Sequence, residues 1–245
     1  MAIIYSKKVQ DSHYQVRTAG QTVRLYSNGV LHSQYNPSNP ISGAIWDLLL
    51  LPGFLLNTPP KHILLLGLGG GTLVHLIRFF FPCAHITCID LDKEHIKIAK
   101  TFFKIPTKNV TIIHGDAYEE MKKIKQKFDW VIDDVFQHVS GEPERGREEH
   151  RLLKTYKGNL AKQAVLSLNV IGRRQMEDLK PLINGFEHAV QFLHPVYENK
   201  IVALYNSGAN KKGFKSKLHA FKALDDSRKT CRLQYSLRVM KTAKR

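Results

Sequence analysis

The stretch Leu64-Leu65-Leu66-Gly67-Leu68-Gly69-Gly70-Gly71-Thr72 decides the fold of this chain. An apolar run that ends in a glycine cluster is typical of a buried parallel strand followed by a tight turn and a helix. Glycines let the backbone bend sharply and let a ligand approach main-chain N–H groups closely. We therefore predict a ligand-binding turn formed by Gly67, Gly69, Gly70 and Gly71.

An acidic residue follows the turn at the distance that a ribose-binding site requires. The apolar run Ile86–Ile89 ends in Asp90, about 20 residues beyond the glycines. An acid at the end of this strand accepts hydrogen bonds from two ribose hydroxyls, as in dinucleotide-binding folds. The structural alternative is a tight turn with a surface acid.

A second acidic position points to the base of the nucleoside. Gly115-Asp116 follows the next apolar run, and an Asp there can accept a hydrogen bond from an adenine amino group. No lysine follows the glycines as it would in a Walker motif, which argues against a triphosphate ligand. Ribose and adenine acids on successive strands predict a site for an S-adenosylmethionine-type nucleoside.

Strands and helices alternate along the middle of the chain. The predicted strands are 62–66, 84–89, 110–114, 128–132 and 165–171, and the predicted helices are 72–81, 92–103, 116–124, 152–164 and 175–184. Strict alternation indicates a parallel sheet that is covered on both faces. With an antiparallel pair at 190–193 and 200–205, we predict an α/β, Rossmann-like, doubly wound, mostly parallel seven-stranded sheet.

Three segments of different character divide the chain. Residues 1–57 are predicted to form a small β-hairpin module, with a turn at Ser27-Asn28-Gly29, and a linking helix. Residues 58–207 form the predicted nucleoside-binding domain. Residues 208–245 form a basic C-terminal helix or tail.

The C-terminal segment carries most of the excess positive charge. The whole chain has a net charge of +16. From Gly208 to Arg245, twelve Lys or Arg residues stand against Asp225 and Asp226, a net charge of +10. Such a segment attracts polyanions such as RNA, or it is simply a solubilising surface. We expect nucleoside binding not to require it, so that residues 227–245 could be removed.

Within this segment, apolar residues recur at helical spacing and are predicted to pack on the domain. They are Phe214, Leu218, Phe221 and Leu224.

The remaining composition excludes several classes of protein. No run approaches the ~20 apolar residues of a membrane span. The first ten residues lack the apolar core of a signal peptide. Cys83, Cys88 and Cys231 have no metal-binding spacing, which favours reduced structural thiols. We expect a cytoplasmic protein without a metal and without a membrane partner.

Taken together, the motifs resemble those of the spermidine synthase (polyamine aminopropyltransferase) family. The resemblance rests on Tyr14-Gln15, Asn28-Gly29-Val30-Leu31, Gly69-Gly70-Gly71, Asp90-Leu91-Asp92, Gly115-Asp116 and 128–134, which fall in the family's order and spacing. It implies that Gln15, Leu91 and Asp134 join the nucleoside site. It also implies that Asp134 accepts a proton from the attacking amine. A homodimer is left open.

The chain departs from the family where the family holds its diamine. Thr72 replaces an acid directly after the glycines, Gln137 replaces a second acid, and Ala44 stands where the family has a tyrosine. A dication needs anionic partners to offset its desolvation. The resemblance therefore implies a spermidine synthase-like protein with another, unidentified small-molecule acceptor.

Other polar residues near the end of the fourth predicted strand have more than one interpretation. Asp133 alternates to the opposite face from Asp134 and is expected to be structural. His138 could accept a proton or be merely exposed. The charged segment Gly141–Arg151 could close over the site as a lid or be a loop.

Three functions remain open. The first is an S-adenosylmethionine-dependent transferase, favoured as a methyltransferase because the diamine acids are missing. The second is a divergent aminopropyltransferase that uses decarboxylated S-adenosylmethionine. The third is a non-catalytic protein that binds a nucleoside or RNA.

Overall fold

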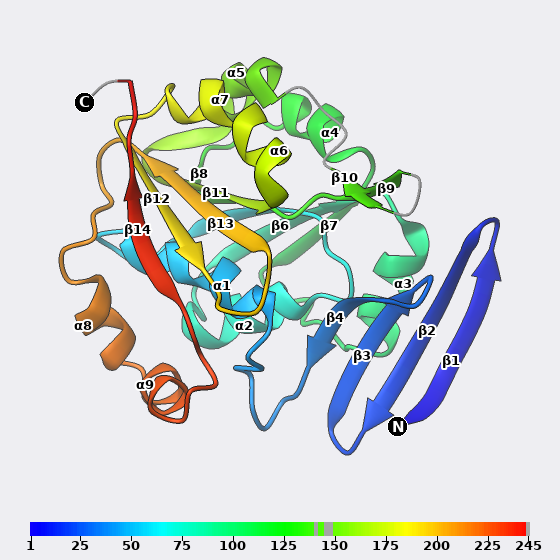
Figure 1. The fold of residues 1–245 in the computed structure, drawn as a ribbon. Coiled ribbons are helices and arrows are strands. Elements are labelled where there is room, and N and C mark those ends of the chain that lie inside the picture. Colours follow the sequence, from blue (N-terminus) through cyan, green and yellow to red (C-terminus); the bar gives the residue numbers. More distant parts are fainter. Residues whose placement is uncertain (140–141, 145–148, 244–245) are drawn as a thin grey trace.

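The computed structural model describes residues 1–139, 142–144 and 149–243, and its centre is an eight-stranded sheet with the order β14-β12-β13-β11-β8-β5-β6-β7 (Figure 1). Its strands are β5 (His62–Leu66), β6 (His85–Asp90), β7 (Val110–His114), β8 (Phe128–Asp133), β11 (Leu160–Ile171), β12 (His188–Leu193), β13 (Asn199–Tyr205) and β14 (Ser236–Met240). Strands β11, β8, β5, β6 and β7 run parallel. The predicted α/β, Rossmann-like fold class is confirmed.

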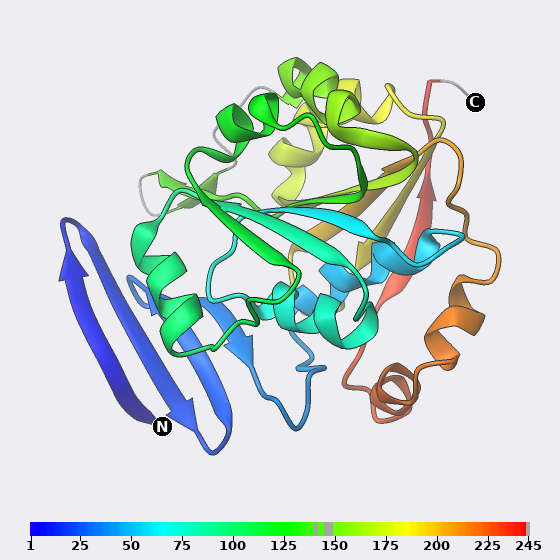
Figure 2. The same ribbon diagram turned by 180° about the vertical axis from the view of Figure 1, so that it is seen from behind.

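Helices cover both faces of this sheet (Figures 1 and 2). On one face lie α1 (Ile45–Leu50), the 3₁₀ helix η1 (Leu51–Leu55), α2 (Thr72–Phe80), α3 (Lys93–Thr101), α8 (Phe214–His219) and α9 (Lys222–Lys229). On the other face lie α4 (Ala117–Lys123), α5 (Glu149–Asn159), α6 (Gly172–Asp178) and α7 (Lys180–Ile183). Each face has its own cluster of buried apolar side chains, as expected for a sheet between two helical layers.

A separate four-stranded antiparallel sheet precedes the main one. It consists of β1 (Ala2–Val9), β2 (Ser12–Ala19), β3 (Thr22–Ser27) and β4 (Val30–Tyr35), in that order. Val16 and Leu25 are fully buried and belong to the same apolar cluster as α1 and α2. The N-terminal sheet is therefore packed onto the parallel sheet through a continuous core. A short hairpin, β9 (Gln137–Val139) and β10 (Glu142–Glu144), follows β8.

The C-terminal segment is more integrated than a tail. Phe214, Leu218 and Leu224 are buried at the predicted helical spacing. Leu233 is also buried, and β14 then pairs antiparallel with β12 as an edge strand. This strand is why the sheet has eight strands where the sequence predicted seven. Removing residues 227–245 would therefore strip an edge strand from the sheet.

One local prediction was wrong, and one strand was missed. The predicted helix 152–164 ends at Asn159, and Leu160–Ala164 belong to β11, whose register with β8 shifts between Leu160 and Val165. β1 was not predicted, because all of its residues except the partly buried Tyr5 are exposed and the strand gives no apolar alternation. No described helix is long and apolar enough to cross a membrane.

Candidate nucleoside-binding site

The glycine turn lies at the carboxyl end of β5, where the strand order reverses between β5 and β8. Ligands of open α/β sheets bind at such a switch point. Gly67, Gly69 and Gly71 have φ angles of +87°, +53° and +87°, which only glycine adopts readily. A Cβ atom on Gly67 would lie 2.7 Å from the carbonyl oxygen of Asp134. The turn thus brings the backbones after β5 and β8 into contact, and no larger residue fits there.

Asp90 holds this turn from the end of β6. Its Oδ2 accepts hydrogen bonds from the N–H groups of Leu68 (2.7 Å) and Gly69 (3.1 Å), and its Oδ1 accepts from the N–H of Asp92 (2.8 Å). The residue is buried. An ionised carboxylate has about four lone-pair positions, so these bonds leave room for a ribose hydroxyl. Asp90 therefore has a structural task in addition to the ligand contact that the sequence predicts.

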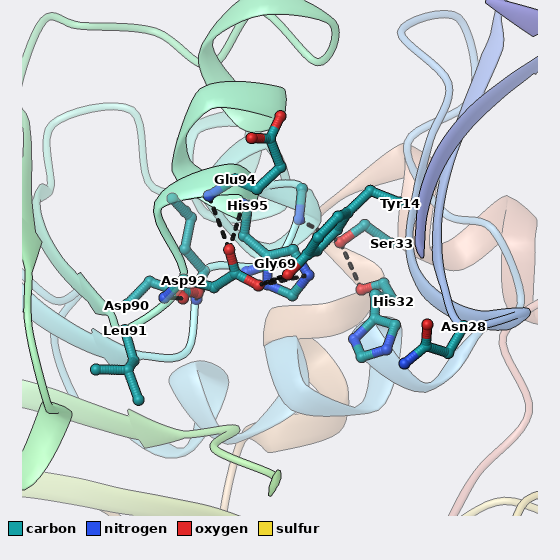
Figure 3. A network of polar contacts seen from close by, with 12 residues as sticks. Tyr14, Asn28, His32, Ser33, Gly69, Asp90, Leu91, Asp92, Glu94 and His95 are labelled. Carbon is teal, nitrogen blue, oxygen red and sulfur yellow. Dashed lines mark hydrogen bonds and ion pairs between the residues drawn. The ribbon is translucent and has the colours of Figure 1, made fainter. Parts of the chain in front are cut away.

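Leu91 presents an apolar surface beside this carboxylate. Its side chain is 59% exposed, and Figure 3 shows it projecting away from the other labelled side chains. Its carbonyl accepts from the His114 ring, and the N–H of Gly115 donates to the carbonyl of Asp90 (3.0 Å). An exposed leucine between the acid that is predicted to bind ribose and the next strand end suits contact with an adenine face.

Asp116 caps the helix after β7. Its Oδ1 accepts from the N–H groups of Tyr118 (3.0 Å) and Glu119 (3.1 Å), as is usual for an N-cap. The Glu120 side chain packs against Gly115. A Cβ atom on Gly115 would lie 2.8 Å from Cγ of Glu120. The hydrogen bond from Gly115 to the carbonyl of Asp90 places Gly115 and Asp116 next to the end of β6. Adenine recognition by Asp116 stays a prediction.

Asp134 and Asp133 lie on opposite faces at the end of β8. Asp134 donates its N–H to the carbonyl of Leu66 (2.9 Å), and its Oδ1 accepts from Nδ2 of Asn169 (2.7 Å). Asp133 is fully buried and accepts from the hydroxyls of Tyr118 and Tyr156 on the other face. This arrangement matches the expected structural role of Asp133 and places Asp134 beside the glycine turn.

The N-terminal sheet completes the turn from the other side. The Ser33 hydroxyl accepts from the N–H of Gly70 (2.6 Å) and donates to the carbonyl of His32 (2.5 Å). Thr72 is buried, and its hydroxyl accepts from the N–H of Gln34 (3.1 Å) and donates to the carbonyl of the same residue (3.0 Å). Strand β4 therefore fixes both the glycine turn and the first residue of α2.

A cluster of polar side chains joins this sheet to α3 (Figure 3). The Tyr14 hydroxyl donates to Oδ2 of Asp92 (2.6 Å), and His95 lies 3.7 Å from the same oxygen. Burial, followed by the hydrogen bond to Asp92, raises the pKa of Tyr14 to about 12. Burial opposes the charge of Asp92, but His95 and the hydrogen bonds from Tyr14 and the backbone hold its pKa below the ordinary value. The His32 ring lies 5.3 Å from that of His95.

Gln15 lies apart from this cluster. Tyr14 and Val16 face the core, and Gln15 alternates to the other face of β2, where its Oε1 accepts from Arg17. The structure thus brings together Gly67–Gly71, Asp90, Leu91, Gly115, Asp116 and Asp134, and it leaves Gln15 outside the group. A ligand role for Gln15 stays a prediction from the resemblance alone.

Sequence reasoning missed three residues at the site: His32, Ser33 and Asn169. Ser33 and His32 belong to a strand far from the glycines in sequence, and only the packing of β4 brings them there. For Asn169 the sequence offered a signal, because a polar residue interrupts the apolar run of β11 and proves to be buried there. The side chains of Gln137, His138 and the whole segment Gly141–Arg151 lie outside the described part. Among the described residues, no cluster of His, Cys, Asp or Glu is suited to hold a metal ion.

Comparison with known proteins gives two groups of relatives. Residues 48–169 match the family model described as the spermine/spermidine synthase domain. A polyamine aminopropyltransferase from Vibrio vulnificus is 30% identical over 53% of this chain and 44% of its own length. An eEF1A lysine and N-terminal methyltransferase from Danio rerio is 26% identical over 46% of this chain and 18% of its own length. The chain thus spans less than half the length of these curated relatives.

Solved structures support the fold. A probable spermidine synthase from Corynebacterium glutamicum superposes with a TM-score of 0.72 and 18% identity, covering 91% of this chain and 89% of the other. Human methyltransferase-like protein 13 in complex with SAH superposes with a TM-score of 0.58 and 20% identity, covering 75% of this chain and 89% of the other. Both aminopropyl- and methyltransferase structures therefore share this architecture.

Proposed function

We propose, on the basis of a spermine/spermidine synthase domain over residues 48–169, that this chain is a transferase that binds an S-adenosyl sulfonium nucleoside and uses an acceptor other than a diamine. Methyl transfer from S-adenosylmethionine is the favoured reaction. The observation that carries this preference is the burial and hydrogen bonding of Thr72. Its hydroxyl is buried and committed to the backbone of Gln34, so it offers a diamine no charge.

The residues present fit a nucleoside of this kind. The turn from Gly67 to Gly71 has no side chains to obstruct a ligand except Leu68. Asp90 has lone pairs left for ribose hydroxyls, and Leu91 offers an exposed apolar surface for the base. Asp116 lies at the next strand end, where it can meet the adenine amino group.

Charge at the start of α2 separates the two possible cosubstrates. The first turn of this helix contains no acidic residue, and helix N-termini carry a partial positive charge. The carboxylate of S-adenosylmethionine is tolerated in such a place, whereas an acid after the glycines would repel it. Threonine in place of that acid does not favour decarboxylated S-adenosylmethionine. The ammonium group of this compound would lose an anionic partner.

The chemistry requires mainly positioning. The bound sulfonium supplies a carbon with a good leaving group. The glycine turn, Asp90 and Leu91 hold the nucleoside so that an acceptor can approach along the line of the breaking bond. Asp134, beside the turn, accepts the proton that the acceptor loses as its new bond to carbon forms. The products are the methylated acceptor, the thioether nucleoside and a proton that Asp134 passes to water.

Two other functions have specific support. The family match and the retained Asp134 favour aminopropyl transfer as the second candidate. Exposed cations of the C-terminal segment, among them Lys211, Lys215 and Lys222, favour binding to a polyanion such as RNA as the third. The free thiols Cys83, Cys88 and Cys231 suit the reducing cytoplasm, which is the compartment we propose.

A ligand screen followed by product analysis tests the proposal. Melting temperatures are compared with S-adenosylmethionine, its decarboxylated form, methylthioadenosine and NAD. A ligand at about 100 times its dissociation constant adds about 2.7 kcal/mol to the free energy of unfolding. We expect stabilisation by the S-adenosyl compounds and none by NAD. Mass spectrometry of metabolite extracts incubated with the protein then shows the gain of one methyl group. The gain of an aminopropyl group, or stabilisation by NAD alone, would overturn the proposal.

A further inference from the structure

A row of three polar side chains crosses three neighbouring strands at the carboxyl edge of the parallel sheet. Nδ2 of Asn199, the first residue of β13, donates to Oδ1 of Asn169 on β11 (2.9 Å). Nδ2 of Asn169 then donates to Oδ1 of Asp134 after β8 (2.7 Å). Asn199 pairs with Ile171, two residues beyond Asn169, so the two amides lie on the same face of the sheet. The row ends beside the glycine turn.

The direction of this row is fixed from its far end. An asparagine amide has a donating and an accepting side, and its neighbours decide which side faces which partner. Because Asn199 donates to Oδ1 of Asn169, the NH₂ group of Asn169 must face Asp134. The opposite orientation would set the carbonyl oxygen of Asn169 against a carboxylate. Asn169 is buried, so water cannot easily replace the missing donor.

We propose that Asn199 is a positioning residue for Asp134, acting through Asn169 to keep an N–H donor on one carboxylate oxygen. The inference rests on the proposed function only for the role of Asp134 as proton acceptor. Hydrogen bonds to an ionised carboxylate are charge-assisted and favour the ionised form. The bond from Asn169 therefore fixes the rotation of the carboxylate and keeps it ready to accept the proton that the acceptor loses.

Three described charged side chains on neighbouring elements lie outside the row. Asp133 is directed to the opposite face, where the hydroxyls of two tyrosines hold it. Asp90 lies at the end of β6, on the far side of β5. Lys200 follows Asn199 and alternates to the opposite face. None of these groups stands in the row, in which Nδ2 of Asn169 donates to Oδ1 of Asp134.

Titration of Asp134 in the ligand-free protein tests the proposal. The full chain is labelled with ¹³Cγ-aspartate, and the Asp134 signal is assigned from its absence in Asp134→Asn. Asn199→Leu removes the donor without adding charge and keeps the number of non-hydrogen atoms in the side chain. We expect it to raise the pKa of Asp134, with a severalfold higher proton affinity, and to speed the hydrogen exchange of the Asn169 side-chain NH₂. If it does not fold, Asn199→Ala gives the same comparison.

The matched control is Lys200→Ala, next to Asn199 on the other face, which should change neither signal. Unchanged titration and exchange in Asn199→Leu, or equal changes in Lys200→Ala, would overturn the proposal. No nucleoside or acceptor is present, so a failure here is distinct from a failure of the proposed function, which the ligand screen detects by itself.

Discussion

At the scale of single residues, Asp90 joins the fold to the proposed function. Its carboxylate binds the backbone of the glycine turn and is also predicted to bind ribose. The sequence predicted the second role from the position of the acid at a strand end. It could not predict the first, because backbone N–H groups are present at every residue and only the coordinates show which ones an acid reaches.

We predict that Asp90→Asn weakens the binding of S-adenosylmethionine by about 1–3 kcal/mol, the cost of leaving ribose hydroxyls poorly paired. Asparagine keeps one acceptor oxygen for the turn, so the melting temperature should fall less than in Asp90→Ala. Calorimetry measures the affinity. Asp129→Asn is the matched control, because Asp129 also accepts from two backbone N–H groups, those of Lys61 and His62, but at the other end of the sheet. Equal affinities in wild type and Asp90→Asn would refute the ribose assignment.

A second residue-scale prediction concerns Asp47. Burial raises its pKa to about 7, although its carboxylate accepts from the N–H groups of Ser42 and Gly43. The folded state therefore binds a proton more tightly than the unfolded chain, whose aspartates titrate near 3.9. This contribution to stability is full below about pH 4, decreases as pH rises, and is lost above about pH 7.

Asp47→Asn removes this titration. We expect the free energy of unfolding of the wild type, relative to the variant, to fall by up to about 1.4 kcal/mol per pH unit between about pH 4 and 7. Urea denaturation at a series of pH values measures the difference. A difference that is constant across this range would show that Asp47 is already ionised in the fold.

At the scale of elements, the contact between β4 and α2 holds Thr72, on which the proposal about the acceptor rests. The sequence identified Thr72 as a departure from the resembled family, but it did not show what the threonine does. In the fold it ties α2 to the N-terminal sheet. Boundaries were harder to predict than elements: apolar periodicity located β5 and β6, whereas β1 and the first residues of β11 lack it.

We predict that putrescine is a poor acceptor. With decarboxylated S-adenosylmethionine as donor, turnover should lie well below the ordinary enzyme range, which begins near ~1 per second. Thr72→Asp should not restore it, because a carboxylate at this buried position faces the carbonyl of Gln34 and lowers the melting temperature instead. Thr72→Ser, which keeps the hydroxyl, serves as the control. Efficient turnover of putrescine by the wild type would contradict this view of the acceptor.

At the scale of the whole molecule, six of the twelve basic residues of the C-terminal segment lie on α8, α9 or β14. The composition predicted the charge, and helical spacing predicted the burial of Phe214 and Leu218. Edge strand β14 was not predicted, since most of its residues are exposed. Deleting residues 227–245 would therefore confuse loss of charge with loss of structure, and neutralising exposed side chains is the sharper test.

We predict that replacing Lys211, Lys212 and Lys215 with glutamine weakens binding to a single-stranded RNA. The slope of log affinity against log salt should fall by about 0.7 for each phosphate contact that is lost. Fluorescence anisotropy at several salt concentrations measures both, while the thermal shift with S-adenosylmethionine stays as in wild type. The control replaces Lys122, Lys123 and Lys125, at the end of α4 and beyond it. If the full chain binds no RNA at low salt, the segment is only a solubilising surface.

The location of the nucleoside is the central claim, and amide NMR tests it most directly. Addition of S-adenosylmethionine to the ¹⁵N-labelled protein should shift the backbone signals of Gly69, Gly70, Leu91 and Gly115. A cavity of about 370 Å³ at the opposite edge of the sheet, lined by Lys157, Lys162 and Phe186 among others, provides an internal comparison. The backbone signals of the residues that line this cavity should not shift. Shifts confined to that cavity, with the glycine turn unchanged, would contradict the account.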